Sequence, residues 1–283
     1  MPPTVSRSDR LKTLAKSPQF IWWLGHVTML VSTAMYVPYW ITFSYKSGAH
    51  WFTRAFFGAM VSYGVVVYKS FPNIQFTTEF AQKLFAEENV QYFLMAIFWW
   101  RSAPMFAPLI PYAVFAFFNS LNYIRTNLLP ALFPEPPAGT TDPIYNKVNA
   151  FSRNLQVWTQ VNHAGAMAFV AYIEVVGVMG SLIFGAITFQ SSLLSPIVYA
   201  NFLRFRYYFS LHTRTAFALI RARLDNLFVP AAGNPQIPPA VARGYTMARD
   251  FIIRFGEAPA GGQQPGGGGG DHRDNDRPDR LRR

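Results

Sequence analysis

Three long stretches of the chain are almost free of charged side chains. Residues 17–45 and 102–124 contain no Asp, Glu, Lys or Arg, and residues 154–203 contain one, Glu174. A helix needs about 20 apolar residues to cross the hydrocarbon layer of a bilayer, and each stretch is long enough. Buried helices of a soluble domain are the alternative, but three such stretches in one chain favour the membrane. The pattern therefore predicts an all-α, polytopic integral membrane helical bundle.

The same pattern predicts about four crossings. We place three of them at residues 19–43, 51–68 and 161–189. Residues 92–124 are also mostly apolar, but Arg101 and three prolines interrupt them. Prolines at membrane depth are tolerated only where neighbouring helices satisfy the freed carbonyls. This segment is therefore either one broken crossing or a re-entrant hairpin, and we take it as one net crossing.

Charge placement sets the expected topology. Only 14% of the residues are charged, yet the net charge is +11, and eight arginines lie within residues 201–256. By the positive-inside rule, both basic flanks should face the cytosol, which requires an even number of crossings. We expect four parts: a basic cytosolic N-terminal tail (1–18), a transmembrane helical region (19–189), a cytosolic or interfacial amphipathic helical region (190–257) and a disordered Gly-rich charged tail (258–283).

The last helical segment, residues 240–255, has an apolar face and a basic reverse. At 100° per residue one arc gathers Val241, Tyr245, Ala248, Phe251, Ile252 and Phe255. Arg243 and Arg254 fall opposite, and Arg249 lies on the flank. A helix lying on an anionic leaflet needs this arrangement. We predict a membrane-interface helix that binds the bilayer and its anionic lipids, with packing on the protein's own bundle as the open alternative.

Two further helical patterns accompany this one. Residues 202–228 repeat the amphipathic scheme, with Phe209 expected to align with Phe217 and the apolar positions that follow it. Within the last span, Gly177, Ser181 and Gly185 recur at i+4 spacing. Small residues at this spacing let another helix approach closely, so we predict a helix-packing stripe.

The sequence offers little catalytic chemistry. It has no cysteine, no H-E-x-x-H, no P-loop and no G-x-S-x-G motif, so we expect no enzymatic activity, no metal and no cofactor. Arg54, His163 and Glu174 are too few and too scattered to define the pore of an ion channel or carrier. We interpret Glu174 as protonated or hydrogen-bonded inside the bundle. A channel or carrier, and a lipid-modifying enzyme, remain the alternative functions. Nothing indicates nucleic-acid binding.

Two segments resemble the transmembrane protein 33 family, which includes fungal pore-membrane proteins. Residues 53–99 follow the family's order, with an Arg-Ala opening, a proline after the second span and a helix leading to Tyr92. Residues 192–225 carry its aromatic and arginine-rich run, at Pro196, Ile197, Val198, Tyr199, Phe202, Leu203, Arg206 and Tyr207. The Gly-rich tail departs from the family pattern.

The resemblance implies a location and a role. Such proteins reside, as multi-pass proteins, in the endoplasmic reticulum membrane and nuclear envelope. They are linked to membrane shaping alongside reticulon-type proteins and, in fungi, to nuclear-pore distribution. Nucleoporins and an importin are the implied partners, with an amphipathic C-terminal region contacting membrane. The resemblance therefore implies a non-enzymatic membrane-organising protein with both termini in the cytosol.

Overall fold

The computed structural model describes residues 6–136, 142–229 and 237–257, and all regular structure in these ranges is helical. This confirms the predicted all-α fold. The predicted disordered tail, 258–283, lies outside the described residues. The helices in chain order are α1 (Arg7–Ala15), α2 (Pro18–Ile41), α3 (Ala49–Ser70), α4 (Thr78–Ala86), α5 (Glu88–Arg101), α6 (Leu109–Tyr123), η1 (Ile124–Leu128), α7 (Leu129–Leu132), α8 (Pro143–Tyr172), η2 (Ile173–Val178), α9 (Met179–Ile187), α10 (Leu194–Phe209), α11 (Leu211–Phe228) and α12 (Pro239–Glu257).

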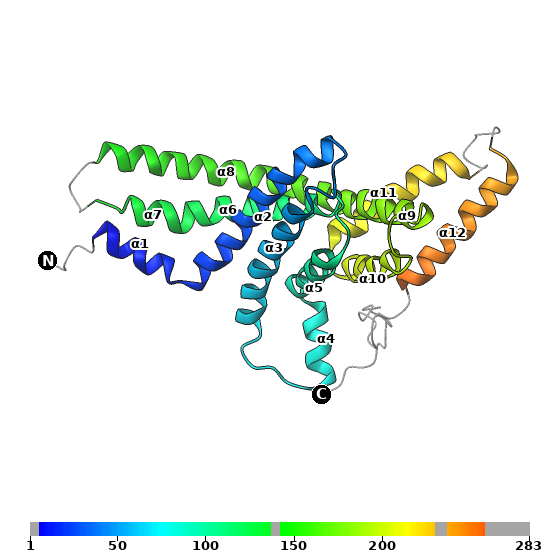
Figure 1. The fold of residues 1–283 in the computed structure, drawn as a ribbon, viewed down its shortest axis with the longest axis horizontal. Helices are drawn as coiled ribbons and strands as arrows, with labels where there is room; N and C mark the ends of the chain where they lie inside the picture. The colour runs from blue at the N-terminus through cyan, green and yellow to red at the C-terminus, as the bar shows by residue number, and fades with distance from the viewer. Residues whose placement is uncertain (1–5, 137–141, 230–236, 258–283) are drawn as a thin grey trace, which may run out of the picture.

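The first two long helices, α2 and α3, correspond to the first two predicted spans and pack closely on each other (Figure 1). Their contact is built on small residues. A Cβ atom placed on Gly58 would lie 2.6 Å from the carbonyl oxygen of Gly25, so only glycine allows this approach. Close by, the Ser62 hydroxyl donates a 2.8 Å hydrogen bond to the carbonyl of Trp22. Small side chains therefore let the two backbones meet, as in membrane helix pairs.

Aromatic rings fill the space between α3, α5 and α6. Tyr63 stacks on Tyr92 with ring centroids 5.6 Å apart, and Phe56 lies beside Trp99. Because residue numbers rise along one helix as they fall along the other, α5 runs antiparallel to α3. Tyr112 of α6 meets both tyrosines edge-on. This buried aromatic cluster positions the polar groups described below.

The predicted third span is divided into two helices. α5 ends at Arg101 and α6 begins at Leu109, with residues 102–108 between them. These helices have 14 and 15 residues, fewer than the roughly 20 needed for a straight crossing. Among the residues that the structure describes, two helices are long and apolar enough to span a membrane by length and composition: Pro18–Ile41 and Pro143–Ile187. The number of crossings therefore stays a prediction.

The last predicted span belongs to a longer helix. α8, η2 and α9 run without a break over Pro143–Ile187, 45 residues, so the helix begins 18 residues before the predicted start of the span at 161. Asp142 caps it by accepting hydrogen bonds from the N–H groups of Ile144 and Tyr145, and Pro143 occupies the first turn, where its missing N–H costs nothing. The π-helical turn η2 contains Glu174. Such turns within α-helices are frequent at functional sites.

The described residues of the C-terminal region form three helices, α10, α11 and α12. Ser210 ends α10 and caps α11 by accepting from the N–H of Thr213, which starts a new helix at Leu211. The expected alignment of Phe209 with Phe217 is therefore wrong, because the two residues belong to different helices. α12, Pro239–Glu257, covers the predicted segment 240–255 and contacts α10 and α11.

Candidate membrane-interface site

A buried ionic cluster joins the long helix to α10 and α5. The Tyr92 hydroxyl donates a 2.6 Å hydrogen bond to Oε1 of Glu174, and Nε of Arg206 lies 3.8 Å from Glu174 Oε2. Arg206 also pairs with Glu88 at 2.7 Å, and its guanidinium lies 5.1 Å from the centre of the Tyr92 ring. The Tyr199 hydroxyl donates to the backbone carbonyl of Glu174. These contacts fasten α10 against the bundle.

Glu174 thus has hydrogen-bond and charge partners inside the protein, and the space beside it measures about 10 Å³, no more than about one water requires. His163 does not join it: the His163 side chain is exposed, and its ring packs perpendicular to the Phe118 ring. Arg54 is also exposed and lies over the Trp51 ring. The three charged or titratable side chains singled out from the sequence therefore lie apart.

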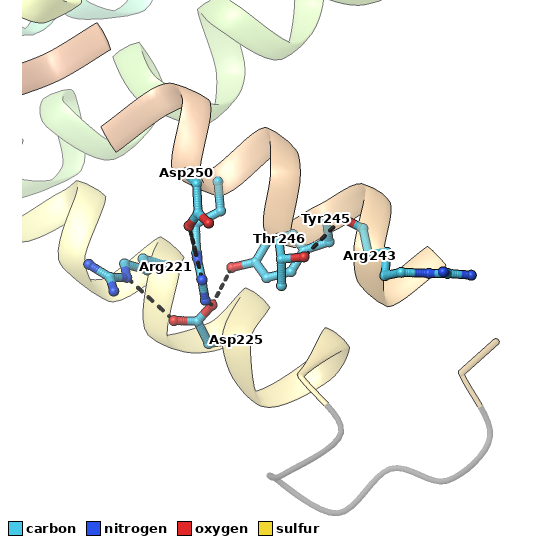
Figure 2. A network of polar contacts seen from close by, with 7 residues as sticks. Arg221, Asp225, Arg243, Tyr245, Thr246 and Asp250 are labelled. Atoms are coloured by element: carbon cyan, nitrogen blue, oxygen red, sulfur yellow. Dashed lines mark hydrogen bonds and ion pairs between the residues drawn. The ribbon is translucent and has the colours of Figure 1, made fainter. Parts of the chain in front are cut away.

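The C-terminal pair α11 and α12 forms the second polar cluster, centred on Asp225 of α11. Its carboxylate accepts hydrogen bonds from the Tyr245 hydroxyl at 2.6 Å, from Arg249 Nη1 at 3.1 Å and from Arg221 Nε at 3.4 Å. Figure 2 shows Tyr245 from α12 and Arg221 from α11 directed at this carboxylate. Arg249 in turn pairs with Asp250, one residue along α12. One carboxylate therefore links the two helices through several donors.

The same contacts shift the pKa values of the two partners in opposite directions. The hydrogen bond from Tyr245, followed by those from Arg249 and Arg221, holds the pKa of Asp225 below its usual range. Partial burial, and then the hydrogen bond to Asp225, raises the pKa of Tyr245 to about 12. At neutral pH the carboxylate is charged and the phenol is protonated, which is the pairing that the contact requires.

Aromatic, cation–π and apolar contacts reinforce this docking of α12. The Phe228 and Tyr245 rings stack with centroids 5.1 Å apart, and the Arg204 guanidinium lies 5.4 Å from the centre of the Phe255 ring. Ala242 is buried, and Ile253 is half-buried. The docked face of α12 therefore runs through Ala242, Tyr245, Thr246, Arg249 and Ile253, at the spacing of one side of a helix.

The predicted apolar arc lies beside this docked face and stays mostly uncovered. Phe251 is 70% exposed, Ile252 55% and Val241 48%. Tyr245, at the edge of the arc nearest the docked face, and Phe255, inside the arc, are half-buried. Thus α12 packs on its own protein through its flank, while the centre of the apolar arc remains accessible.

The predicted basic residues of α12 separate into two kinds. Arg243 and Arg254 are exposed, and Arg243 Nε donates to the Pro239 carbonyl of its own helix. Arg249 is half-buried between Asp225 and Asp250. Only the first two therefore present exposed side chains on the polar side of the helix.

The small-residue stripe lies along the end of the long helix. Gly177 is half-buried, and a Cβ atom placed there would meet Ile173 of the same helix at 3.4 Å. The Ser181 hydroxyl donates to the Gly177 carbonyl, 2.6 Å away. Gly185 is buried, and a Cβ atom there would lie 2.7 Å from the hydroxyl of Ser191, just beyond the helix end. Contact of this stripe with a further helix stays a prediction.

Sequence reasoning missed several residues that organise these clusters. In the sequence, Arg206 is visible only as part of an aromatic and arginine-rich run, and Glu88 carries no signal of its role. Asp225 carries a local signal, because Arg221 precedes it by four residues, the spacing of a helical ion pair. Among the described residues, no three His, Asp or Glu side chains come together as a metal site.

An all-α chain with long apolar helices, a buried ionic cluster and an amphipathic C-terminal helix is the organisation of a multi-helix membrane protein. Residues 3–258 match the family model described as Transmembrane protein 33/Nucleoporin POM33. The chain belongs to this family and is an all-α membrane protein. The resemblance seen in the two sequence segments is thereby confirmed.

Individual relatives agree with this assignment. The chain is 34% identical to Nucleoporin POM33 of Chaetomium thermophilum, over 88% of this chain and 92% of that protein. It is 30% identical to Tetra-spanning protein 1 of Schizosaccharomyces pombe, over 90% of each chain. It is also 30% identical to the Pore membrane protein of 33 kDa of Saccharomyces cerevisiae, over 90% of this chain and 91% of that protein. No solved structure matches the chain.

Proposed function

We propose that this protein is a non-enzymatic membrane-organising component of the endoplasmic reticulum and nuclear envelope. It acts in membrane shaping and in the distribution of nuclear pore complexes, and α12 attaches its C-terminal region to the bilayer surface. The names of its relatives support the location, since they describe a nucleoporin, a pore membrane protein and a pore and endoplasmic reticulum protein. Reticulon-type proteins, nucleoporins and an importin are the proposed protein partners.

The observation that carries the proposal is the exposed centre of the apolar arc of α12. A helix that served only to complete the bundle would turn its apolar side inward, because burying apolar surface is the main gain from packing. Here Phe251 and Ile252 point away from the helices that hold α12. Exposed arginines on the other side add attraction to an anionic leaflet, about 1 kcal/mol for each residue near the surface.

A channel or carrier is less well supported by the same geometry. Conduction needs polar groups along a water-filled path. Glu174 instead adjoins a space of only about 10 Å³, and its carboxylate oxygens contact Tyr92 and Arg206. These contacts suit a structural role. We therefore retain membrane organisation as the proposed function.

The proposal is tested with the double substitution Phe251→Asp and Ile252→Asp in the tagged full-length protein. Two charges on the apolar arc should abolish attachment of α12 to the membrane while leaving the protein inserted. Its distribution in the nuclear envelope and reticulum should then become abnormal, and pore complexes should cluster.

A matched control adds the same charge away from the arc. Thr215→Asp with Asn226→Asp places two acidic groups at exposed positions on α11. This variant should behave as the parent does. If both variant proteins are distributed in the nuclear envelope and reticulum as the parent is, the proposed role of α12 is contradicted.

A further inference from the structure

The contact between Asp225, Tyr245 and Arg249 fixes the rotation of α12 about its own axis. The Asp225 carboxylate on α11 accepts from three donors, and the two that come from α12, Tyr245 and Arg249, lie one helical turn apart. A single hydrogen bond would leave α12 free to roll, but two donors on one side of a helix, with a stacked ring beside them, define which side faces α11. We call the contact among Asp225, Tyr245 and Arg249 the α11–α12 latch.

The rotation that the latch selects decides where the apolar arc points. At 100° per residue, the docked face and the apolar arc are centred about 110° apart around α12. Docking through Ala242, Tyr245 and Arg249 therefore leaves Phe251 and Ile252 turned away from α11. If α12 rolled by that angle, the arc would be covered by α11 and lost to any external surface.

We infer that the latch is a positioning device, which presents the apolar arc of α12 to the bilayer, and that Arg249 serves the latch instead of binding lipid headgroups. This inference rests on the proposed membrane attachment of α12. It divides the three arginines predicted for the interface: Arg249 orients the helix, and Arg243 and Arg254 supply the attraction to anionic lipid. In Figure 2, Arg243 extends away from the Asp225 cluster.

An isolated surface ion pair would not support such a role, because exposed pairs contribute little to stability. The latch differs in two respects. The Asp225 carboxylate is partly covered and accepts three hydrogen bonds, and the Arg249 guanidinium is held by two carboxylates. A network of this kind has fewer alternative geometries than a single pair, so it can specify orientation.

The absence of cysteine from the chain permits a direct experiment on the full-length protein. Cysteines replacing Ala218 of α11 and Met247 of α12, both exposed, carry spin labels that report the distance between the helices in detergent. In anionic vesicles, single labels at Ala248, on the arc, and at Arg243, on the polar side, report depth through their accessibility to oxygen and to a water-soluble relaxant.

The decisive comparison is between Arg249→Gln and Arg254→Gln, which remove the same charge from the same helix. We expect Arg249→Gln to abolish the narrow distance peak and to reduce the depth difference between the two single labels. Arg254→Gln should leave the distance peak unchanged. It should lower the fraction of bilayer-inserted Ala248 label at about 0.1 M salt, and this difference from the parent should shrink at about 1 M, where the Debye length falls from about 10 Å to about 3 Å.

Asp225→Asn tests the latch from the other helix, and combining it with Arg249→Gln should add nothing to the loss of the distance peak. Conservation of the narrow peak in Arg249→Gln, or identical depth profiles for Arg249→Gln and Arg254→Gln, would overturn the inference. A narrow peak that Arg249→Gln abolishes, together with a parent Ala248 label that stays in water, would instead overturn the proposed membrane attachment, since the helix contact would then exist without it.

Discussion

Gly25 and Gly58 determine how closely α2 and α3 approach. Each sits where a Cβ atom would fall within 2.6 Å of the other's carbonyl oxygen, and backbone atoms cannot yield as a flexible side chain can. Gly180 is not constrained in this way, because a Cβ atom placed on it would meet nothing within 4 Å. The same residue type is therefore essential at one position and replaceable at another.

We predict that Gly58→Ala destabilises the protein by about 1–3 kcal/mol, the usual cost of overpacking. The added methyl group must separate the two helices, and this outweighs the better helix propensity of alanine, about 1 kcal/mol. Gly180→Ala is the control, and it should leave stability unchanged or slightly raised. Thermal unfolding in detergent, followed by tryptophan fluorescence, measures both. A Gly58→Ala protein as stable as the control would show that the helices are not limited by backbone contact.

The buried pair of Glu174 and Arg206 makes a second prediction. Arg206→Met leaves the Glu174 carboxyl buried without its cation, and breaking a buried pair in this way costs about 3–5 kcal/mol. Glu174→Gln combined with Arg206→Met should recover most of this loss, because a neutral amide needs no counter-charge. Arg223→Met, at an exposed position on α11, is the control for loss of an arginine. If the double variant is no more stable than Arg206→Met alone, the pair does not hold α10 in place.

Helices with one dominant pattern were predictable from the sequence, and those that depend on tertiary contacts were not. α2, α3 and α12 lie within a few residues of their predicted bounds, because a long apolar run or a clear amphipathic period defines each. The first half of α8 was not predicted because residues 143–160 are too polar for a membrane span, although their apolar positions recur at helical spacing, at Ile144, Val148, Phe151, Leu155 and Trp158. The end of α10 at Ser210 was not predicted, because the only signal is the capping side chain of Ser210 within an otherwise continuous helical pattern.

The candidate site was predictable in part for the same reason. The apolar arc of α12 follows from periodicity alone, and its central residues are exposed as a surface-binding helix requires. The residues that hold α12 in place do not recur at a regular spacing, so periodicity does not reveal them. Asp225 lies 20 residues before Tyr245, and Arg206 lies 32 residues after Glu174, so each pair depends on how whole helices pack.

The α11–α12 latch should depend on pH in a defined way. Because the pKa of Asp225 is lowered in the folded protein, its contribution is complete above its ordinary pKa, about 3.9, and is lost as pH falls through the lowered value. The pKa of Tyr245 is raised to about 12, so its contribution persists below its ordinary value, about 10, and is lost as pH rises through about 12.

The groups facing Asp225 are Arg221 on its own helix and Tyr245 and Arg249 on α12, with Asp250 facing Arg249. Arginine stays charged throughout this range. We therefore expect the distance between labels on α11 and α12 to be constant from about pH 5 to about pH 10 and to broaden below about pH 4. A transition near pH 6.5, where histidine titrates, would assign the contact to other groups.

The arrangement of the whole chain across the membrane is the remaining question. In the described part of the chain two helices are long and apolar enough to span it, whereas the hydrophobic pattern predicts four crossings. With two crossings, α3 to α7 would all lie on the far side of the membrane. With four, α3 returns the chain to the cytosol, so that α4 is cytosolic. The position of α4 therefore separates the two topologies.

We predict four crossings with both termini in the cytosol, because basic residues flank the apolar region at both ends. In sealed microsomes, added protease should digest tags at both ends. Single cysteines in the otherwise cysteine-free chain locate the loops through their reaction with a membrane-impermeant maleimide. Cysteine at Ser47, between α2 and α3, should react only after detergent is added, whereas cysteine at Gln82, exposed on α4, should react in intact microsomes. Protection of the Gln82 position with both tags digested would establish two crossings, and protection of either tag would require an odd number.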